Sequence, residues 1–532
     1  MHRSIHEKSC SNYLDSATAR GMTIFATANA NIARKDKKMQ KKAVCVMVLG
    51  TSSGAGKSWL ATALCRYYRN LGIKVAAFKA QNMSNNARVV PAEDGAYGEI
   101  GAAQYFQALA AGVQPVVRMN PLLLKPEADT RSQVILLGRV HPELTSTPWR
   151  GRSALVWPQI AAALDSLRAE NDVVVIEGAG SPAETNLAAS DVVNMRVAEY
   201  AGANCILVSD IDRGGAFAHL YGTWALLPES QRHLIKGFVL NKFRGDASLL
   251  SPAPEDLEQR TGVPTLGVIP MQYGHGLPEE DGVFDASPSG VGGTGRAQTK
   301  IAVIAYPRIS NLDEFQPLKN CAGVQLVWAR SPADLHGADW VILPGSKATA
   351  ADMAWLRAQK LDAAIAAHAA AGGMVLGVCG GLQMLGEALI DTDHIDGNGP
   401  GLGLLPLVTA FAVEKTVRPF KGAFAPMQGG WSALSGVALA GYEIHHGQTA
   451  LHPAMVAAGV TAAQVLPDGL GWGNQAGNVL GLYIHGLFED ERVLQALFGQ
   501  NARSLDSVFD GLAANLQAAL GDAALQRLLQ QA

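Results

Sequence analysis

The chain has 532 residues, of which 48% are hydrophobic and 17% are charged, so it is neither a disordered chain nor a coiled coil. At roughly 150 residues per domain, this length predicts three to four domains, or two large ones. Lys and Arg (43) nearly balance Asp and Glu (46), which leaves a net charge of −3 and no global basic field for nucleic acid.

The remaining composition indicates a soluble α/β protein. No apolar stretch approaches the roughly 18 residues that cross a bilayer, so we expect no membrane partner. The 57 glycines suit the many tight strand-to-helix turns of an α/β fold. Six cysteines without a CxxC pair argue against a disulfide framework or a zinc site, and favour a reducing compartment, the cytoplasm.

Residues 1–42 differ from the rest of the chain because they are polar and close on a basic cluster at 34–38. They lack the apolar core of roughly 7–15 residues that a secretory signal requires. We interpret them as a disordered or non-native N-terminal extension, with Met39 as a candidate start. An organelle transit peptide is the alternative.

Short, continuous apolar runs then recur, each followed by Gly or polar residues and a helix-like segment. Continuous rather than alternating apolarity is typical of strands buried on both faces of a parallel sheet. In such sheets the ligand binds at the carboxyl ends of the strands. We therefore predict a parallel α/β domain over 43–284, with strands at 44–49, 75–78, 173–176, 206–208, 238–240 and 266–269.

A stretch rich in Ser, Pro, Gly and Thr at 285–299 cannot bury enough apolar area to pack, and it is interpreted as a linker. The strand–helix rhythm then restarts. It predicts a second α/β domain over 300–495, with strands at 301–305, 324–328, 341–343 and 374–378, and a C-terminal helical segment over 496–532.

The first strand leads into the sequence GTSSGAGKS, and a helix follows. Small residues such as Thr51, Gly54 and Gly56 let backbone N–H groups turn toward an anion, and a helix N-terminus adds its positive end. Lys57 would then reach the β- and γ-phosphates of ATP, and the Ser58 hydroxyl would bind Mg²⁺. The loop has one residue more than the common phosphate-binding pattern. The alternative is a Gly-rich turn with a surface lysine.

Two further charged residues follow predicted strands of the first domain. Glu177 stands where a nucleotide-binding fold of this kind places a second Mg²⁺ partner, and Lys79 could hold a transferring phosphoryl group. A solvated or helix-capping glutamate and an ordinary lysine are the alternatives. Glu99 is a weaker candidate for another Mg²⁺ ligand.

The second domain contains the turn GVCGGLQ between a strand and a helix, with Cys379 at its centre. Small residues around a single nucleophile at such a corner describe a strained elbow that exposes the side chain above the sheet. The backbone N–H groups of Gly345, in the sequence LPGSK, and of Gly380 could form an oxyanion hole. The alternative for Cys379 is a small buried apolar side chain, as expected of the other cysteines.

A cysteine nucleophile needs a base, and His485, at the end of a predicted strand, is the first choice. His445 and His446 compete for this role.

These motifs resemble known families. The extended phosphate loop resembles that of dethiobiotin synthetase and related carboxylate-activating ligases. The GxCxGxQ turn, the LPGS loop and the downstream histidine resemble the class I glutamine amidotransferases, which have a flavodoxin-like α/β fold.

The class I family usually has a glutamate two residues after the histidine, but Leu487 stands there. This departure resembles the cobyrinic/cobyric acid synthase branch, whose members work with a Cys–His pair. Glu443 is a weak candidate for orienting His485.

Longer stretches are similar to the cobyric acid synthase family, almost end to end from position 46: 79–84, 119–126, 210–215, 237–246 and 307–311. The resemblance implies glutamine hydrolysis coupled to ATP- and Mg²⁺-dependent amidation of carboxylates b, d, e and g of adenosylcobyrinic acid a,c-diamide. The alternatives are an a,c-diamide synthase, a related amidating ligase, or a nucleotide switch with a non-catalytic glutaminase-like domain. Cations suited to such a polyanionic corrinoid are Arg118, Lys125, Arg131, Arg213, Lys242 and Arg244.

Overall fold

The computed structural model describes residues 42–128, 130–278, 299–499 and 503–530. It separates residues 1–43 from one compact unit, Val44–Ala532, to which the following description applies. The expectations for the N-terminal extension and for the linker therefore fall almost entirely outside the described residues. Of the helices that the structure describes, none is both long and apolar enough to cross a bilayer.

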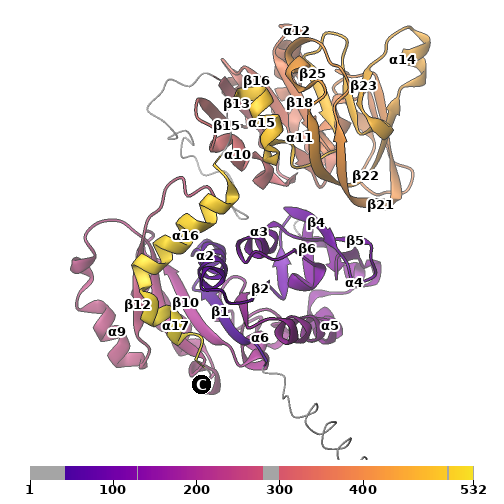
Figure 1. The fold of residues 1–532 in the computed structure, drawn as a ribbon. Helices are drawn as coiled ribbons and strands as arrows, with labels where there is room; N and C mark the ends of the chain where they lie inside the picture. Colours follow the sequence, from indigo (N-terminus) through magenta and orange to yellow (C-terminus); the bar gives the residue numbers. More distant parts are fainter. Residues whose placement is uncertain (1–41, 129, 279–298, 500–502, 531–532) are drawn as a thin grey trace, which may run out of the picture. The chain divides into compact units, whose positions relative to one another are not determined.

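The first domain is built on a six-stranded sheet in the order β12-β11-β10-β1-β9-β2, and every neighbouring pair is parallel (Figure 1). Each predicted apolar run of this domain lies in one of these strands. The central strand is fully buried from Val46 to Leu49, because helices pack on both faces of the sheet. The strands are β1 (Val44–Gly50), β2 (Val75–Phe78), β9 (Val173–Glu177), β10 (Asn204–Asp210), β11 (Ile235–Phe243) and β12 (Thr265–Pro270).

A large insertion between β2 and β9 was not predicted. It forms a four-stranded sheet from β3 (Gln81–Met83), β6 (Leu122–Ala128), β7 (Arg131–Leu136) and β8 (Arg139–Val140). A hairpin of β4 (Ala87–Pro91) and β5 (Tyr97–Gly101) leads into helix α3 (Ala102–Ala110), and helix α5 (Trp149–Glu170) returns the chain to β9.

The second domain has a seven-stranded sheet in the order β15-β13-β16-β18-β25-β24-β23. Its first five strands are parallel and its last two pairs are antiparallel. The strands are β13 (Thr299–Ile304), β15 (Val324–Ala329), β16 (Trp340–Leu343), β18 (Met374–Val378), β23 (Ala463–Leu466), β24 (Gly471–Gly473) and β25 (Val479–Leu482). A long hairpin of β21 (Leu407–Ala423) and β22 (Ala438–Leu451) belongs to a separate four-stranded sheet of the same domain, together with β19 (Ala388–Ile390) and β20 (Gly399–Pro400).

The C-terminal segment divides between the two domains. Helix α15 (Glu491–Phe498) packs into the core of the second domain through Val493 and Leu494. Helices α16 (Leu505–Leu520) and α17 (Asp522–Arg527) return to the first domain, where α16 lies against β12 and helix α2 (Lys57–Asn70) (Figure 1). Apolar residues of α16 and α17 join the first domain's core, so that core is built from both ends of the chain.

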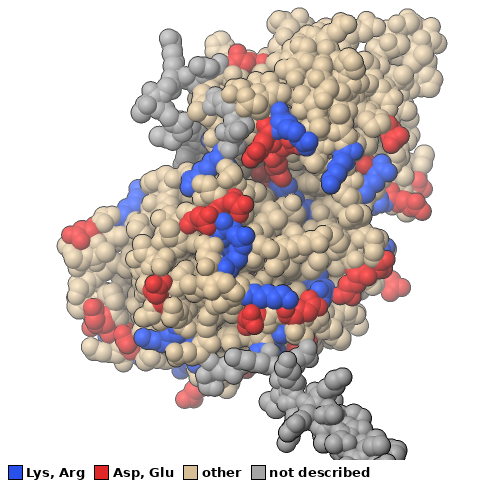
Figure 2. Space-filling view, viewed as in Figure 1, with Lys and Arg blue, Asp and Glu red and all other residues tan. Residues whose placement is uncertain are grey.

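Charge is mixed over the face of the molecule drawn in Figure 2. Blue and red side chains alternate there, and the drawn face carries no extended basic stripe. This agrees with the near-balance of charge in the sequence.

Candidate active sites

The phosphate-binding loop runs from the end of β1 to the start of α2 and is clamped by the neighbouring strands. The Thr51 backbone N–H donates to the Val208 carbonyl, and the Thr51 hydroxyl donates to the Ser209 hydroxyl at 3.0 Å. Asn241, on β11, donates from Nδ2 to the Ala55 carbonyl at 3.0 Å. These contacts hold the loop over the carboxyl ends of the strands, where an anion would meet its N–H groups.

Two glycines of the loop have left-handed backbones, with φ of +71° at Gly54 and +101° at Gly56. A methyl group at Gly56 would lie 2.0 Å from Nδ2 of Asn241, so only glycine fits there. The glycines are therefore needed for the shape of the loop.

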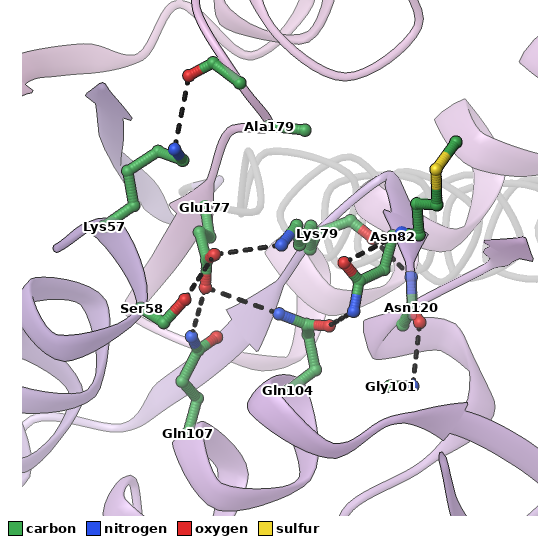
Figure 3. Close-up of polar contacts among 12 residues, drawn as sticks. Lys57, Ser58, Lys79, Asn82, Gly101, Gln104, Gln107, Asn120, Glu177 and Ala179 are labelled. Carbon is green, nitrogen blue, oxygen red and sulfur yellow. Dashed lines mark hydrogen bonds and ion pairs between the residues drawn. The ribbon is translucent and has the colours of Figure 1, made fainter. Parts of the chain in front are cut away.

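Lys57, the lysine of this loop, folds back over the loop. The Lys57 ammonium donates to the carbonyls of Ser52 at 2.9 Å and of Gly180 at 3.2 Å. Figure 3 shows the Lys57 side chain with its ammonium joined by a dashed line to a carbonyl oxygen. A phosphate group would replace these carbonyls as its partner.

Glu177, at the end of β9, is the centre of a buried polar group (Figure 3). Its Oε1 atom accepts from the Ser58 hydroxyl at 2.8 Å and pairs with the Lys79 ammonium at 2.9 Å. Its Oε2 atom accepts from Gln104 at 3.5 Å and from Gln107, both on α3. Burial by itself would raise the pKa of Glu177, but the Lys79 ammonium and the hydrogen bonds from Gln107 and Ser58 hold that pKa below its usual range.

This group fits Mg²⁺. The ion prefers hard oxygen ligands, and it commonly takes one or two from the protein and the rest from phosphates and water. The Ser58 hydroxyl and the ionised Glu177 carboxylate lie side by side at the phosphate loop and provide such a pair. Among the residues that the structure describes, no cluster of three His, Cys, Asp or Glu suited to a metal occurs.

The prediction of Glu99 as a further Mg²⁺ ligand is wrong. Its carboxylate is buried against the ammonium groups of Lys125, at 2.7 Å, and of Lys415 on β21. Glu99 therefore belongs to a separate charge cluster between the two domains.

The phosphate loop opens into a cavity of about 2190 Å³ that also reaches Lys319 and Trp328 of the second domain. A single drug-sized ligand usually occupies roughly 300–1000 Å³, so this cavity has room for a nucleotide and a second, large ligand.

Of the six cations suggested for a polyanionic substrate, Arg213 and Lys242 line this cavity, where both also pair with Asp210. The other four are not among the residues that line the cavity, and they pair with other carboxylates: Arg118 with Glu170, Lys125 with Glu99, Arg131 with Glu127, and Arg244 with Asp212.

Cys379 occupies the corner between β18 and helix α13 (Gly380–Leu385), with φ of +52° and ψ of −106°. This conformation is strained for a residue with a side chain, as the elbow prediction requires. The flanking glycines make the corner possible. A methyl group at Gly381 would lie 1.9 Å from the Leu343 carbonyl oxygen, and one at Gly377 would lie 2.6 Å from the Gly381 carbonyl carbon.

His485 lies beside this thiol, and its imidazole hydrogen-bonds Cys379. Its Nδ1 atom is 3.1 Å from Oε1 of Glu314, whose Oε2 accepts from the Gly486 N–H at 3.0 Å. His485 and Glu314 are each only 1% exposed. Burial would lower the pKa of His485, but the Glu314 carboxylate and the neighbouring Cys379 raise that pKa to about 10.

Glu314 was missed from the sequence. The family resemblance directed attention to position 487, and Leu487 is instead packed in the core of the second domain. Glu314 comes from η4 (Leu312–Phe315), three residues past a stretch of family similarity, and no local spacing links it to His485.

The other candidates for the base and its partner lie elsewhere. Glu443 contacts Nε2 of His445 at 3.0 Å and Nε of Arg418 at 2.6 Å, so the suggestion that it orients His485 is wrong. His445 stacks on Tyr483. His446 contacts the Ala412 carbonyl at 3.1 Å, and burial lowers its pKa to about 4.

The two glycines predicted for the oxyanion hole lie next to this pair. A methyl group at Gly345 would be 3.0 Å from Cε1 of His485, and one at Gly380 would be 2.8 Å from the Ser346 backbone nitrogen. The structure therefore brings Cys379, His485, Gly345 and Gly380 together.

Comparison with known proteins identifies both halves of the chain. Residues 300–493 match the family described as the CobB/CobQ-like glutamine amidotransferase domain. Residues 46–275 match the CobQ/CobB/MinD/ParA nucleotide binding domain. These matches and the two sites define a glutamine amidotransferase that carries its own nucleotide-binding domain, and they confirm the predicted fold class.

Relatives that match over most of the chain sharpen this class. The chain is 72% identical over 487 residues to "Cobyric acid synthase" of Acidovorax sp. (strain JS42), covering 92% of this chain and 98% of that protein. It is 69% identical over 469 residues to the protein of the same name from Variovorax paradoxus (strain S110), and the match covers 88% of this chain and 96% of that protein. The protein of the same name from Leptothrix cholodnii is 64% identical over 488 residues, and the match covers 89% of this chain and 95% of that protein. The chain belongs to the cobyric acid synthase family, so the expected enzyme class, an amidating ligase of cobalamin biosynthesis, is confirmed.

Proposed function

We propose that the two sites catalyse two half-reactions, with Cys379 releasing ammonia from glutamine and the phosphate-loop site activating a carboxylate with ATP. Family membership supports the overall reaction. The residue assignment rests on one observation: Cys379, His485 and the glycines Gly345 and Gly380 converge from separate segments on one strained corner.

In the glutaminase half-reaction, the Cys379 thiolate attacks the side-chain amide carbon of glutamine. The carbonyl oxygen becomes an oxyanion that accepts hydrogen bonds from the Gly345 and Gly380 N–H groups. His485 donates its proton to the leaving nitrogen, ammonia departs, and a thioester to Cys379 remains. Water, deprotonated by His485, then attacks the thioester and releases glutamate and the thiolate.

In the ligase half-reaction, a substrate carboxylate oxygen attacks the γ-phosphorus of ATP, which yields an acyl phosphate and ADP. Lys57 and Lys79 neutralise charge on the transferring phosphoryl group, and the loop N–H groups hold the remaining phosphates. Mg²⁺ held by Ser58 and Glu177 would supply further positive charge there. Ammonia then attacks the acyl carbon, loses a proton, and displaces phosphate to give the amide.

The acceptor that we propose is adenosylcobyrinic acid a,c-diamide, amidated at carboxylates b, d, e and g. The large cavity beside the phosphate loop and its cations Arg213 and Lys242 support a bulky polyanion. Cobyrinic acid is the alternative acceptor. We also propose a cytoplasmic location, supported by the five free cysteines among the described residues.

The test is mass spectrometry of the corrinoid after incubation with ATP, Mg²⁺ and glutamine. We expect four successive losses of one dalton each, because every amidation replaces OH by NH₂. Modification of cobyrinic acid in its place would favour the alternative. In Cys379→Ala, we expect no glutamine hydrolysis, while amidation driven by added ammonia continues. Glutamine hydrolysis by this variant would exclude Cys379 as the nucleophile.

A further inference from the structure

Arg88 belongs to the first domain, but its guanidinium is bound by the second. It lies on β4 and is 1% exposed. It forms an ion pair with Asp313, and its NH1 and NH2 groups contact the two carboxylate oxygens of Glu489 at 2.8 and 2.6 Å. Removing one partner of such a buried group is costly because it leaves the others uncompensated.

Both acids adjoin the glutaminase pair. Asp313 directly precedes Glu314 in η4, and Glu489 ends η8 (Leu487–Glu489), immediately after the turn that carries His485. The Glu489 N–H donates to the carbonyl of Gly486, whose own N–H donates to Glu314. Arg88 therefore holds the two segments that supply the imidazole and its carboxylate.

A third partner of Arg88 stacks directly on the imidazole. The guanidinium lies 5.4 Å from the centre of the Tyr442 ring. That ring stacks on His485 with centroids 5.4 Å apart and planes 21° apart. Tyr442 and His485 also exchange two backbone hydrogen bonds, at 2.9 and 3.3 Å.

The residues next to Arg88 bind the same loop of the second domain. Asn311 donates from Nδ2 to the Ala87 carbonyl at 2.8 Å, and the Leu312 N–H donates to Oδ1 of Asn86 at 3.0 Å. Hydrogen bonds from the first domain thus help to position the loop that carries Glu314.

On its other side, Arg88 rests on α3, with its guanidinium 5.4 Å from the Tyr105 ring and 5.0 Å from the Phe106 ring. The same helix carries Gln104 and Gln107, which bind Glu177 at the phosphate loop (Figure 3). Helix α3 therefore contacts both the nucleotide site and the arginine that holds the glutaminase site.

We propose that Arg88 is a positioning residue of the glutaminase reaction, supplied by the ligase domain: it fixes Glu314 and His485 through Asp313, Glu489 and Tyr442. Through α3 it also links the occupancy of the nucleotide site to glutamine hydrolysis. This inference rests on the assignment of Cys379 and His485 as the glutaminase pair.

The test compares Arg88→Met with Arg139→Met in the full-length enzyme. Arg139 is an exposed arginine on β8 that pairs with Asp94 beside the same hairpin, so its replacement controls for the loss of an ion pair there. We expect Arg88→Met to lower kcat for glutamine hydrolysis by roughly 2- to 30-fold, with little change in KM for glutamine, and to reduce its stimulation by ATP and acceptor. Ammonia-driven amidation should stay within about twofold of the wild type, and Arg139→Met should change neither activity.

Arg88→Lys keeps the charge but loses the two-pronged contact, so we expect an intermediate kcat. In a Glu314→Gln background, Arg88→Met should have a much smaller effect, because both changes act on His485. Three outcomes would overturn the inference. The first is unchanged glutaminase activity in Arg88→Met. The second is an equal fall of glutamine hydrolysis and ammonia-driven amidation in both Arg88→Met and Arg88→Lys, and the third is additive effects in the double variant. Loss of hydrolysis in Cys379→Ala with normal hydrolysis in Arg88→Met would refute only the role of Arg88, whereas hydrolysis by Cys379→Ala would refute the proposed function.

Discussion

His485 and Glu314 form an ion pair in which both side chains are buried, and Cys379 lies beside the imidazole. The pair keeps the imidazole charged at neutral pH, because its pKa of about 10 lies above the ordinary value of 6.5. Its contribution to folding stability is fully present below pH about 6.5, and it is lost as the pH rises through about 10. A charged imidazole can protonate the leaving nitrogen, so the same contact would also serve the proposed glutaminase reaction.

We predict that Glu314→Gln lowers glutamine hydrolysis on the order of 100-fold at pH 7. The amide cannot compensate the imidazolium, so the pKa of His485 falls and the alkaline limb of the pH–rate profile moves to lower pH. Steady-state hydrolysis measured between pH 6 and about pH 10 checks this. Glu443→Gln is the matched control, because Glu443 contacts His445 and Arg418 instead. An unshifted profile would contradict the role of Glu314.

Lys79 has a comparable function at the other site, where it compensates the buried Glu177 carboxylate. In the wild type the pKa of Glu177 is held low, so this carboxylate stabilises the fold above its ordinary pKa of 4.5 and ceases to do so as the pH falls through the lowered value.

We predict that Lys79→Met abolishes ATP-dependent amidation and costs about 3 kcal/mol of stability at pH 7. Burial then raises the pKa of Glu177, so the pH dependence reverses and the variant regains stability as the pH falls toward 5. Urea unfolding at pH 7 and pH 5 measures this. Lys74→Met is the control, because Lys74 is exposed and directly precedes β2, the strand that Lys79 follows. This variant should leave the unfolding midpoint unchanged. A stability loss in Lys79→Met that does not depend on pH would contradict the explanation.

At the scale of elements, both sites lie where a buried parallel strand turns into a helix. At the glutaminase corner, α13 approaches β16 so closely that Gly381 has no room for a methyl group beside the Leu343 carbonyl. The approach places Gly380 against Ser346 of β17 (Gly345–Ser346), and thus sets the distance between the two N–H groups of the proposed oxyanion hole.

We predict that Gly381→Ala moves α13 away from β16, destabilises the second domain by about 1–3 kcal/mol and sharply lowers glutamine hydrolysis. Thermal unfolding together with a glutaminase assay would measure both effects. Gly222→Ala, in helix α7 (Ala216–Leu226), is the control, because nothing lies within 4 Å of the added methyl group. Alanine there should be neutral or stabilising. A Gly381→Ala enzyme with wild-type stability would show that the corner can relax.

At the scale of the whole molecule, coupling of the two reactions requires ammonia to reach the acyl phosphate before it is lost to water. A buried charge cluster joins the domains, with Glu99 of β5 between Lys125 of β6 and Lys415 of β21. Burial lowers the pKa of Lys415 to about 7, although Glu99 acts in the opposite direction. The Glu99 carboxylate therefore favours the charged form of Lys415 at this interface.

We predict that Glu99→Gln loosens this contact and uncouples the reactions. The wild type should form one glutamate per amide, and the variant should form more, because ammonia escapes. The ratio of glutamate to amidated corrinoid measures this. Glu93→Gln, at an exposed glutamate that pairs with Arg118, should keep the wild-type ratio. An unchanged ratio in Glu99→Gln would assign the cluster a purely structural role.

The strands, the phosphate loop and the nucleophile turn could all be predicted from the sequence, because they depend on neighbours along the chain. Continuous apolarity marks a strand buried on both faces, and the glycines around Lys57 and Cys379 mark backbones that only small residues allow. Since parallel strands end at one edge, the proximity of Lys79, Ser58 and Glu177 also followed from the sequence.

The distant residues that complete each site became apparent only from the folded chain. Glu314 replaces the glutamate expected beside His485, Arg88 reaches the glutaminase site from the other domain, and α16 returns to the core of the first domain. These contacts join residues separated by most of a domain or more, and they are made by single side chains with no periodic pattern around them. Such pairings are set by how whole elements pack, so no local signal in the chain predicts them.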